Sequence, residues 1–118
     1  MALYTHLPLY KASYTLLLEI NKMLVNVPRD SRFSIGQDLR HCVMQIILSI
    51  YRANSCTRKV SIIRHMRSLL VQVQVYIRLL CDMRHISEKQ YLRLVEQTTA
   101  MSKQMAAWEK SQTGKQEN

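Results

Sequence analysis

The sequence predicts an all-α protein folded as an antiparallel up-and-down four-helix bundle. The chain of 118 residues is long enough to form one hydrophobic core, and 47% of it is apolar. It contains only two glycines and two prolines, so it lacks the turn residues that many short strands and hairpins require. Apolar residues instead recur at three- and four-residue steps in four long segments, which is the pattern of amphipathic helices.

A joint around Pro28 is expected to separate the first two helices. The first helix begins at Pro8, because proline is favoured in the first turn of a helix. The second helix follows an N-cap at Asp30 or Ser31 and fades near Asn54. Their predicted core residues are Tyr10, Tyr14, Leu17, Ile20, Leu24 and Val27 in the first helix, and Leu39, Cys42, Val43, Ile46, Ile47 and Ile50 in the second.

The third helix is expected to begin at a cap on Ser55 or Thr57 and to end at about Arg84. Ser87 and Gln90 then form a capping box, in which each side chain bonds the backbone N–H of the other residue, and the fourth helix follows. The predicted core residues are Ile62, Met66, Leu69, Val73, Tyr76 and Leu80 in the third helix, and Tyr91, Val95, Thr98, Met101, Met105 and Trp108 in the fourth. Such spacing is typical of helices in bundles.

One domain is expected over residues 1–110, followed by a polar, disordered tail over residues 111–118. No apolar run approaches the roughly 18 residues that a membrane-spanning helix needs, and the N-terminus lacks the pattern of a signal peptide. The three cysteines are widely spaced without a CxxC pair, which favours thiols in a reducing compartment. These features predict a soluble, cytoplasmic protein.

The charge is strongly positive and unevenly distributed. Seventeen Lys and Arg residues against eight Asp and Glu give a net charge of +9, and no acidic residue lies between Asp38 and Asp82. The basic residues of that stretch are the candidate nucleic-acid or partner-binding residues: Arg40, Arg52, Arg58, Lys59, Arg64, Arg67 and Arg78. Arginine suits this role because its planar fork donates two parallel hydrogen bonds to a phosphate. A solvated surface without a partner is the alternative.

The two middle helices carry more apolar residues than a monomeric bundle needs. Ile63, Leu70 and Ile77 lie beside the predicted core stripe, whereas Met44, Leu48, Tyr51, Val71, Val75 and Leu79 lie away from it. Single exposed aliphatic side chains are common on any surface, but these are clustered. The clustering predicts a homo-oligomer.

Enzyme chemistry finds little support in the sequence. The histidines and carboxylates show no metal-ligand spacing, so no metal, cofactor or small-molecule substrate is expected. Six residues separate Arg58 from His65 and Arg78 from His85, a spacing that resembles the Arg/His motif of helical HEPN ribonucleases. This spacing is common by chance in an arginine-rich chain, and a non-enzymatic protein is the favoured interpretation.

Four features of the chain together carry a family resemblance: the joint at residues 27–29, the segment at residues 76–80, the start of the last helix at Ile86 and Ser87, and Trp108. With them, the chain from Pro8 to about Trp108 resembles the accessory variability determinant (Avd) proteins of diversity-generating retroelements, which are related to four-helix proteins encoded in ribosomal-RNA intervening sequences. Arg78 corresponds to one of the family's basic positions in the third helix. Gln74 stands where a second basic residue is expected.

The resemblance implies a homopentameric barrel of bundles in a bacterial or phage-encoded system. It further implies an accessory protein that binds a reverse transcriptase and its template RNA, or an RNA/DNA hybrid, and supports mutagenic retrohoming. One alternative is a stand-alone RNA-binding protein of the intervening-sequence type without a polymerase partner. Another is a structural oligomer whose charge serves only solubility.

Overall fold

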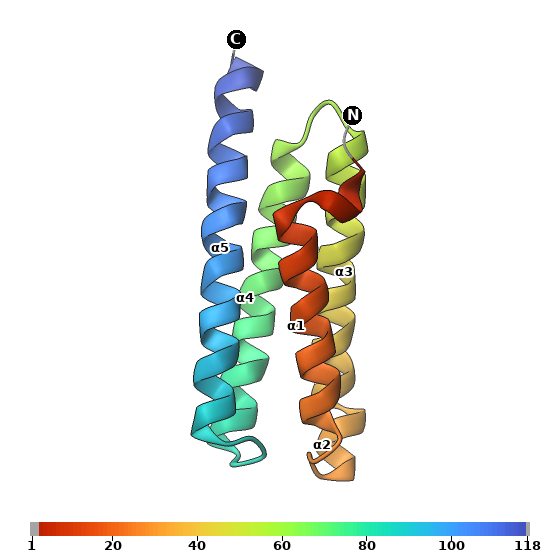
Figure 1. The fold of residues 1–118 in the computed structure, drawn as a ribbon, viewed down its shortest axis with the longest axis vertical. Coiled ribbons are helices and arrows are strands. Elements are labelled where there is room, and N and C mark those ends of the chain that lie inside the picture. The colour runs from red at the N-terminus through yellow and green to blue at the C-terminus, as the bar shows by residue number, and fades with distance from the viewer. Residues whose placement is uncertain (1–2, 118) are drawn as a thin grey trace.

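The structure, a computed structural model that describes residues 3–117, is a bundle of four long helices with alternating directions (Figure 1). The long helices are α1 (Pro8–Leu24), α3 (Ile35–Ser55), α4 (Val60–Asp82) and α5 (Glu88–Glu117), and the short elements are η1 (Tyr4–His6) and α2 (Arg29–Phe33). Helices α1 and α4 each pack against both α3 and α5, which closes the four into a ring. The described residues contain no strand, so the all-α prediction is confirmed.

The core is one apolar cluster along the bundle axis, and α3 fills its predicted place in it. All six predicted core residues of α3 are buried. In α4 the buried stripe is broader than predicted, because Ile63, Leu70 and Ile77 are buried whereas Ile62 and Tyr76 are only partly covered. These three residues belong to the core of one chain and contribute nothing to an additional apolar face.

The predicted core residues Ile20, Leu24 and Val27 are buried, but the prediction is wrong in the first half of α1. Leu9, Ser13 and Leu16 face the core, whereas Tyr14 is exposed and Tyr10 and Leu17 lie at its edge. A serine can occupy this core position because its hydroxyl donates a 2.7 Å hydrogen bond to the carbonyl of Leu9, one turn earlier. The tyrosines instead form a cluster on the flank of α1, where the ring of Tyr4 meets those of Tyr10 and Tyr51 edge to face.

Two exposed apolar stripes remain on the middle helices. Met44, Leu48 and Tyr51 of α3 are 41%, 45% and 51% exposed, and Val71, Val75 and Leu79 of α4 are 57%, 60% and 39% exposed. Tyr14 of α1 extends the α3 stripe, because its ring stacks on Tyr10, which meets Tyr51 of α3 through Tyr4. The outward positions named by the sequence are therefore outward in the structure.

The first joint contains the short helix α2, which the sequence did not predict. Neither Asp30 nor Ser31 caps α3, which begins after Ser34 without a side-chain cap. The hydroxyl of Ser34 instead donates to the carbonyl of Asp30 at 2.7 Å, within the turn. Ser31 is buried, and its hydroxyl lies 2.9 Å from Nε2 of His85 in the joint between α4 and α5.

The joint between α3 and α4 also differs from the prediction. Helix α4 begins at Val60 and has no side-chain cap, so neither Ser55 nor Thr57 caps it. The hydroxyl of Ser55 donates to the carbonyl of Tyr51 at 3.2 Å, within α3. Lys59 donates its ammonium group to the carbonyls of Ala53 and Asn54 and thereby satisfies the free carbonyl end of α3.

The joint between α4 and α5 follows the prediction closely. The backbone N–H of Ser87 donates to Oε1 of Gln90 at 2.9 Å, and the N–H of Gln90 donates to the hydroxyl of Ser87 at 3.1 Å, which confirms the capping box. Helix α4 ends at Asp82 with Arg84 in the left-handed region at φ 61°. The N–H of Arg84 donates to the carbonyl of Cys81 and that of His85 to the carbonyl of Leu80, which is a Schellman motif.

Helix α5 is longer than predicted. It continues to Glu117, through most of the segment for which the sequence predicts a disordered tail, and Asn118 lies outside the described residues. The hydroxyls of Ser111 and Thr113 each donate at 2.8 Å to a carbonyl of the preceding turn, and Gln112 is buried. No helix among the described residues is long and apolar enough to cross a membrane.

We expect Ser87→Ala to lower the free energy of unfolding by about 1 kcal/mol, because it removes the capping hydroxyl from the start of α5. The matched control is Ser55→Ala, which removes an exposed hydroxyl bonded only within its own helix and should change stability by less than about 0.5 kcal/mol. Urea unfolding followed by circular dichroism measures both. Equal losses in the two variants would contradict the assigned cap.

Candidate nucleic-acid interface

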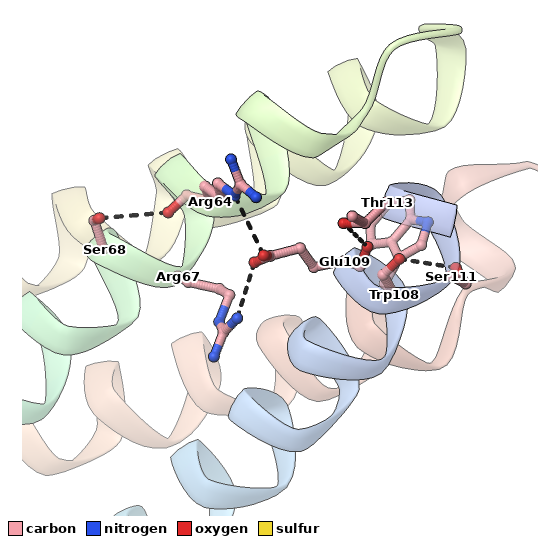
Figure 2. A network of polar contacts seen from close by, with 7 residues as sticks. All are labelled: Arg64, Arg67, Ser68, Trp108, Glu109, Ser111 and Thr113. Atoms are coloured by element: carbon pink, nitrogen blue, oxygen red, sulfur yellow. Dashed lines mark hydrogen bonds and ion pairs between the residues drawn. The ribbon is translucent and has the colours of Figure 1, made fainter. Parts of the chain in front are cut away.

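Two arginines of α4 converge on one carboxylate of α5. The core packing of Met66 and Leu70 turns Arg64 and Arg67 toward α5, where Glu109 lies between them. Nε of Arg64 lies 3.2 Å from Oε2 of Glu109, and Nη1 of Arg67 lies 2.8 Å from Oε1 (Figure 2). One carboxylate therefore pairs with two guanidinium groups, which leaves a net positive charge on the three side chains.

The ion pairs stabilise the charged form of Glu109. The hydrogen bond from Arg67 is the main cause that lowers the pKa of this carboxyl below its usual value, and Arg64 adds to the effect against the opposing cost of desolvation. The side chains of Arg64 and Arg67 are nevertheless 64% and 42% exposed. Each guanidinium group can therefore contact a second anion from the solvent.

Arg78 lies on the same helix, three turns beyond Arg67, and faces solvent near α5. Its Nε lies 3.1 Å from Oδ2 of Asp82, one turn further along α4. Hydrogen bonds to Asp82 and then to Tyr91 raise the pKa of the Arg78 guanidinium above its usual range. An open hollow of about 400 Å³ separates Arg78 from Arg84. We call Arg64, Arg67 and Arg78 the arginine ridge.

The remaining predicted residues lie at two other places. Arg52, Arg58 and Lys59 lie at the joint between α3 and α4, where Arg52 donates to the hydroxyl of Ser49 and Lys59 caps α3. Arg40 lies on the other side of α3 and donates to Oδ1 of Asn21 on α1 at 3.3 Å. The structure thus joins the ridge to the nearby joint of α3 and α4, but it separates Arg40 from both.

A second group of basic residues was missed by the sequence analysis. Arg29 and Arg32 of α2 and Arg84 of the joint between α4 and α5 lie at the opposite end of the bundle from the joint between α3 and α4 (Figure 1). We call this group the basic end. The charge pattern alone could not reveal it, because more than 50 residues separate α2 from Arg84 in the sequence. The contact between Ser31 and His85 is what brings the two segments together.

No cluster of metal-ligating side chains and no disulfide is present among the described residues. No three His, Cys, Asp or Glu side chains there lie close enough together to hold a metal ion. The three cysteines are free thiols, and the buried thiol of Cys42 has a pKa raised mainly by desolvation. His85 of the HEPN-like spacing is engaged with Ser31, and Arg78 is engaged with Asp82.

We expect Glu109→Gln to lower stability at neutral pH and to reduce the loss of stability on acidification. A carboxyl whose pKa is lowered in the folded state stabilises that state above its unfolded pKa, near 4.5, and loses this effect as the pH falls through the folded pKa. The difference between wild type and variant should therefore shrink below about pH 4.5. Urea unfolding at pH 7 and pH 3 measures it, and a difference that is independent of pH would contradict the ion pairs.

Comparison with known proteins supports the family suggested by the sequence. The family model described as bAvd-like matches residues 9–112. No curated protein matches the chain. The match begins one residue into α1 and ends within the last turns of α5, so it covers all four long helices and both groups of basic residues. The chain belongs to the bAvd-like family.

Proposed function

We propose that this protein is a non-enzymatic accessory factor of a diversity-generating retroelement. In this role it binds the element's reverse transcriptase and its template RNA, or an RNA/DNA hybrid, and supports mutagenic retrohoming in the cytoplasm of a bacterial host. Membership of the bAvd-like family supports the accessory role. The observation that carries nucleic-acid binding is the pair of arginines that share Glu109 on an exposed surface.

The ion pairs with Glu109 do not prevent the arginines from binding phosphate. Exposed ion pairs typically contribute only about 0–1 kcal/mol, because water and salt screen them and the side chains lose entropy. Each guanidinium group has five N–H donors, and the contacts with Glu109 use one from Arg64 and one from Arg67. A phosphate can therefore bind beside the carboxylate, which holds the two side chains toward α5.

The remaining predicted residues extend the proposed interface in one direction. Arg52, Arg58 and Lys59 lie at or beside the joint between α3 and α4, next to the start of the ridge, and we include them in the proposed interface. Arg40 lies apart from these residues, so we assign it to the interface with the polymerase or with another copy. The stand-alone RNA-binding protein remains the second candidate, because it would use the same ridge.

We also propose that the protein is a homo-oligomer, as a pentamer by family resemblance. The exposed stripe of Met44, Leu48 and Tyr51, extended by Tyr14, supplies an apolar surface of the kind that interfaces bury. The ridge lies on the opposite flank of the bundle, between α4 and α5. It therefore stays accessible to RNA when another copy covers this stripe.

Neutralising Arg64 and Arg67 together as Gln should weaken binding of single-stranded RNA at least several-fold. It should also reduce the slope of log affinity against log salt by about 0.7 for each lost phosphate contact. Glu109→Gln should have the opposite effect, because it removes the competing negative charge. Fluorescence anisotropy over a salt series measures all three proteins, with circular dichroism as the control for folding. Equal affinities would refute the ridge as the interface.

The reverse transcriptase encoded by the same element should co-purify with the wild-type protein from cells that express both. The stand-alone RNA-binding protein predicts no such complex. Nuclease treatment of the lysate separates direct contact from a bridge of RNA, because a direct complex survives it. Binding of RNA without any polymerase complex would favour the second candidate.

Light scattering at micromolar concentration should give a mass several times that of one chain, 13.9 kDa. Leu48→Glu should lower this mass, because it places a charge within the apolar stripe of α3. Val71→Glu is the matched control, because it places the same charge in the exposed stripe of α4, near the ridge. It should leave the mass unchanged. A monomeric mass for the wild-type protein would refute the oligomer.

A further inference from the structure

We propose that the basic end binds an unpaired base of single-stranded RNA, which stacks on Phe33 while arginines bind the neighbouring phosphates. This inference rests on the proposed function and extends it to a second contact on the same chain. The carrying observation is that Phe33, the one phenylalanine of the sequence, is 58% exposed at the end of α2 and lies under two arginines.

The geometry around Phe33 is that of a stacking platform with cations attached. The guanidinium carbons of Arg29 and Arg32 lie 5.7 and 5.4 Å from the centre of its ring. Arg32 also donates to the carbonyl of Val25 at 3.3 Å, which ties α2 to the end of α1. Base stacking on aromatic rings is stronger than an exposed cation–π contact, so a base can displace one of the guanidinium groups from the ring. The displaced arginine remains close enough to bind a phosphate.

The third cation of this end occupies a backbone position that glycine would fill at lower cost. Arg84 has φ 61° at the end of α4, in a motif where glycine is the usual residue because a side chain is disfavoured there. Strained residues of this kind concentrate at functional sites. Arg84 precedes His85, whose ring meets Ser31 on the buried face of α2, so Arg84 lies at the same end of the bundle as the platform. The side chain of Arg84 is exposed and free to meet an anion from solvent.

Charge favours RNA over a second copy of this chain as the occupant. Helix α2 carries Arg29 and Arg32 against one acidic residue, Asp30, and Arg84 adds a positive charge at the same end, where Asp82 and Glu88 line the hollow beside it. Two copies that met through Phe33 would bring these like charges together, whereas a polyanion would neutralise them. The hollow between Arg78 and Arg84 is also lined by Asp82 and Glu88, so the platform and the ridge are separate contacts.

The test uses a single-stranded RNA of roughly 12 nucleotides that carries the fluorescent base 2-aminopurine, a length within the usual site sizes of single-strand binders. Wild-type protein should quench the fluorescence, because the base stacks on the ring. Phe33→Leu keeps an apolar side chain but removes the ring, and it should abolish the quenching and weaken binding about tenfold. Phe33→Tyr is the matched control and should retain both. Binding of duplex RNA should be unchanged in all three proteins, because its bases are already paired.

Arg84→Gly gives a second measurement that a merely structural role would not produce. Relief of the left-handed strain should raise the melting temperature by roughly 4 °C. Loss of the guanidinium group should nevertheless weaken binding of the single-stranded RNA several-fold. A variant that is more stable and binds less RNA supports the inference, and one that is more stable and binds equally well overturns the part assigned to Arg84.

Three outcomes separate this inference from the proposed function. Equal quenching by the wild type and Phe33→Leu overturns the platform, and the loss of affinity in the Arg64 and Arg67 variant then still supports the ridge. A lower mass of Phe33→Leu in light scattering, with unchanged RNA binding, overturns the platform in favour of a contact between copies. No binding of RNA by the wild-type protein overturns both the platform and the ridge.

Discussion

Burial of one apolar stripe on each of the four long helices is the constraint on which the other features depend, because it fixes the rotation of every helix about its axis. In α4, Met66, Val73 and Leu80 are fully buried. With these residues inward, Arg67 turns to the flank facing α5, and Val75 turns to the solvent. The charged ridge and the exposed apolar stripes are therefore two consequences of the same packing.

The spacing of apolar residues predicted the buried face reliably in helices whose apolar residues are concentrated on one face. It identified every core residue of α3 that it named, and the capping box of Ser87 identified the start of α5. It failed in the first half of α1, where tyrosines at the helix flank were mistaken for core residues and the buried Ser13 was passed over, whereas Ile20 and Leu24 were predicted correctly. A serine can be buried when its hydroxyl donates a hydrogen bond to a carbonyl of the preceding turn, but the sequence alone does not show whether that bond forms.

The location of charge was predictable from the sequence, but its pairing was not. The long stretch free of acidic residues correctly pointed to α3 and α4 as basic. The partner of Arg64 and Arg67 is Glu109, which lies more than 40 residues away and meets them only through the antiparallel register of α4 and α5. The place of Arg84 at the same end as Arg29 and Arg32 was missed for a similar reason, since it depends on the contact between Ser31 and His85 across 54 residues.

Charge and apolar surface oppose each other in the proposed assembly. A net charge of +9 on each chain repels other copies, and the repulsion grows with every copy added. The exposed stripe of α3 would favour association, and the ridge lies on the flank between α4 and α5, away from this stripe. A bound polyanion would offset the remaining repulsion. Binding of RNA and self-association would then be linked. Bound RNA would reduce the repulsion between copies, and each added copy would strengthen the positive field that attracts RNA.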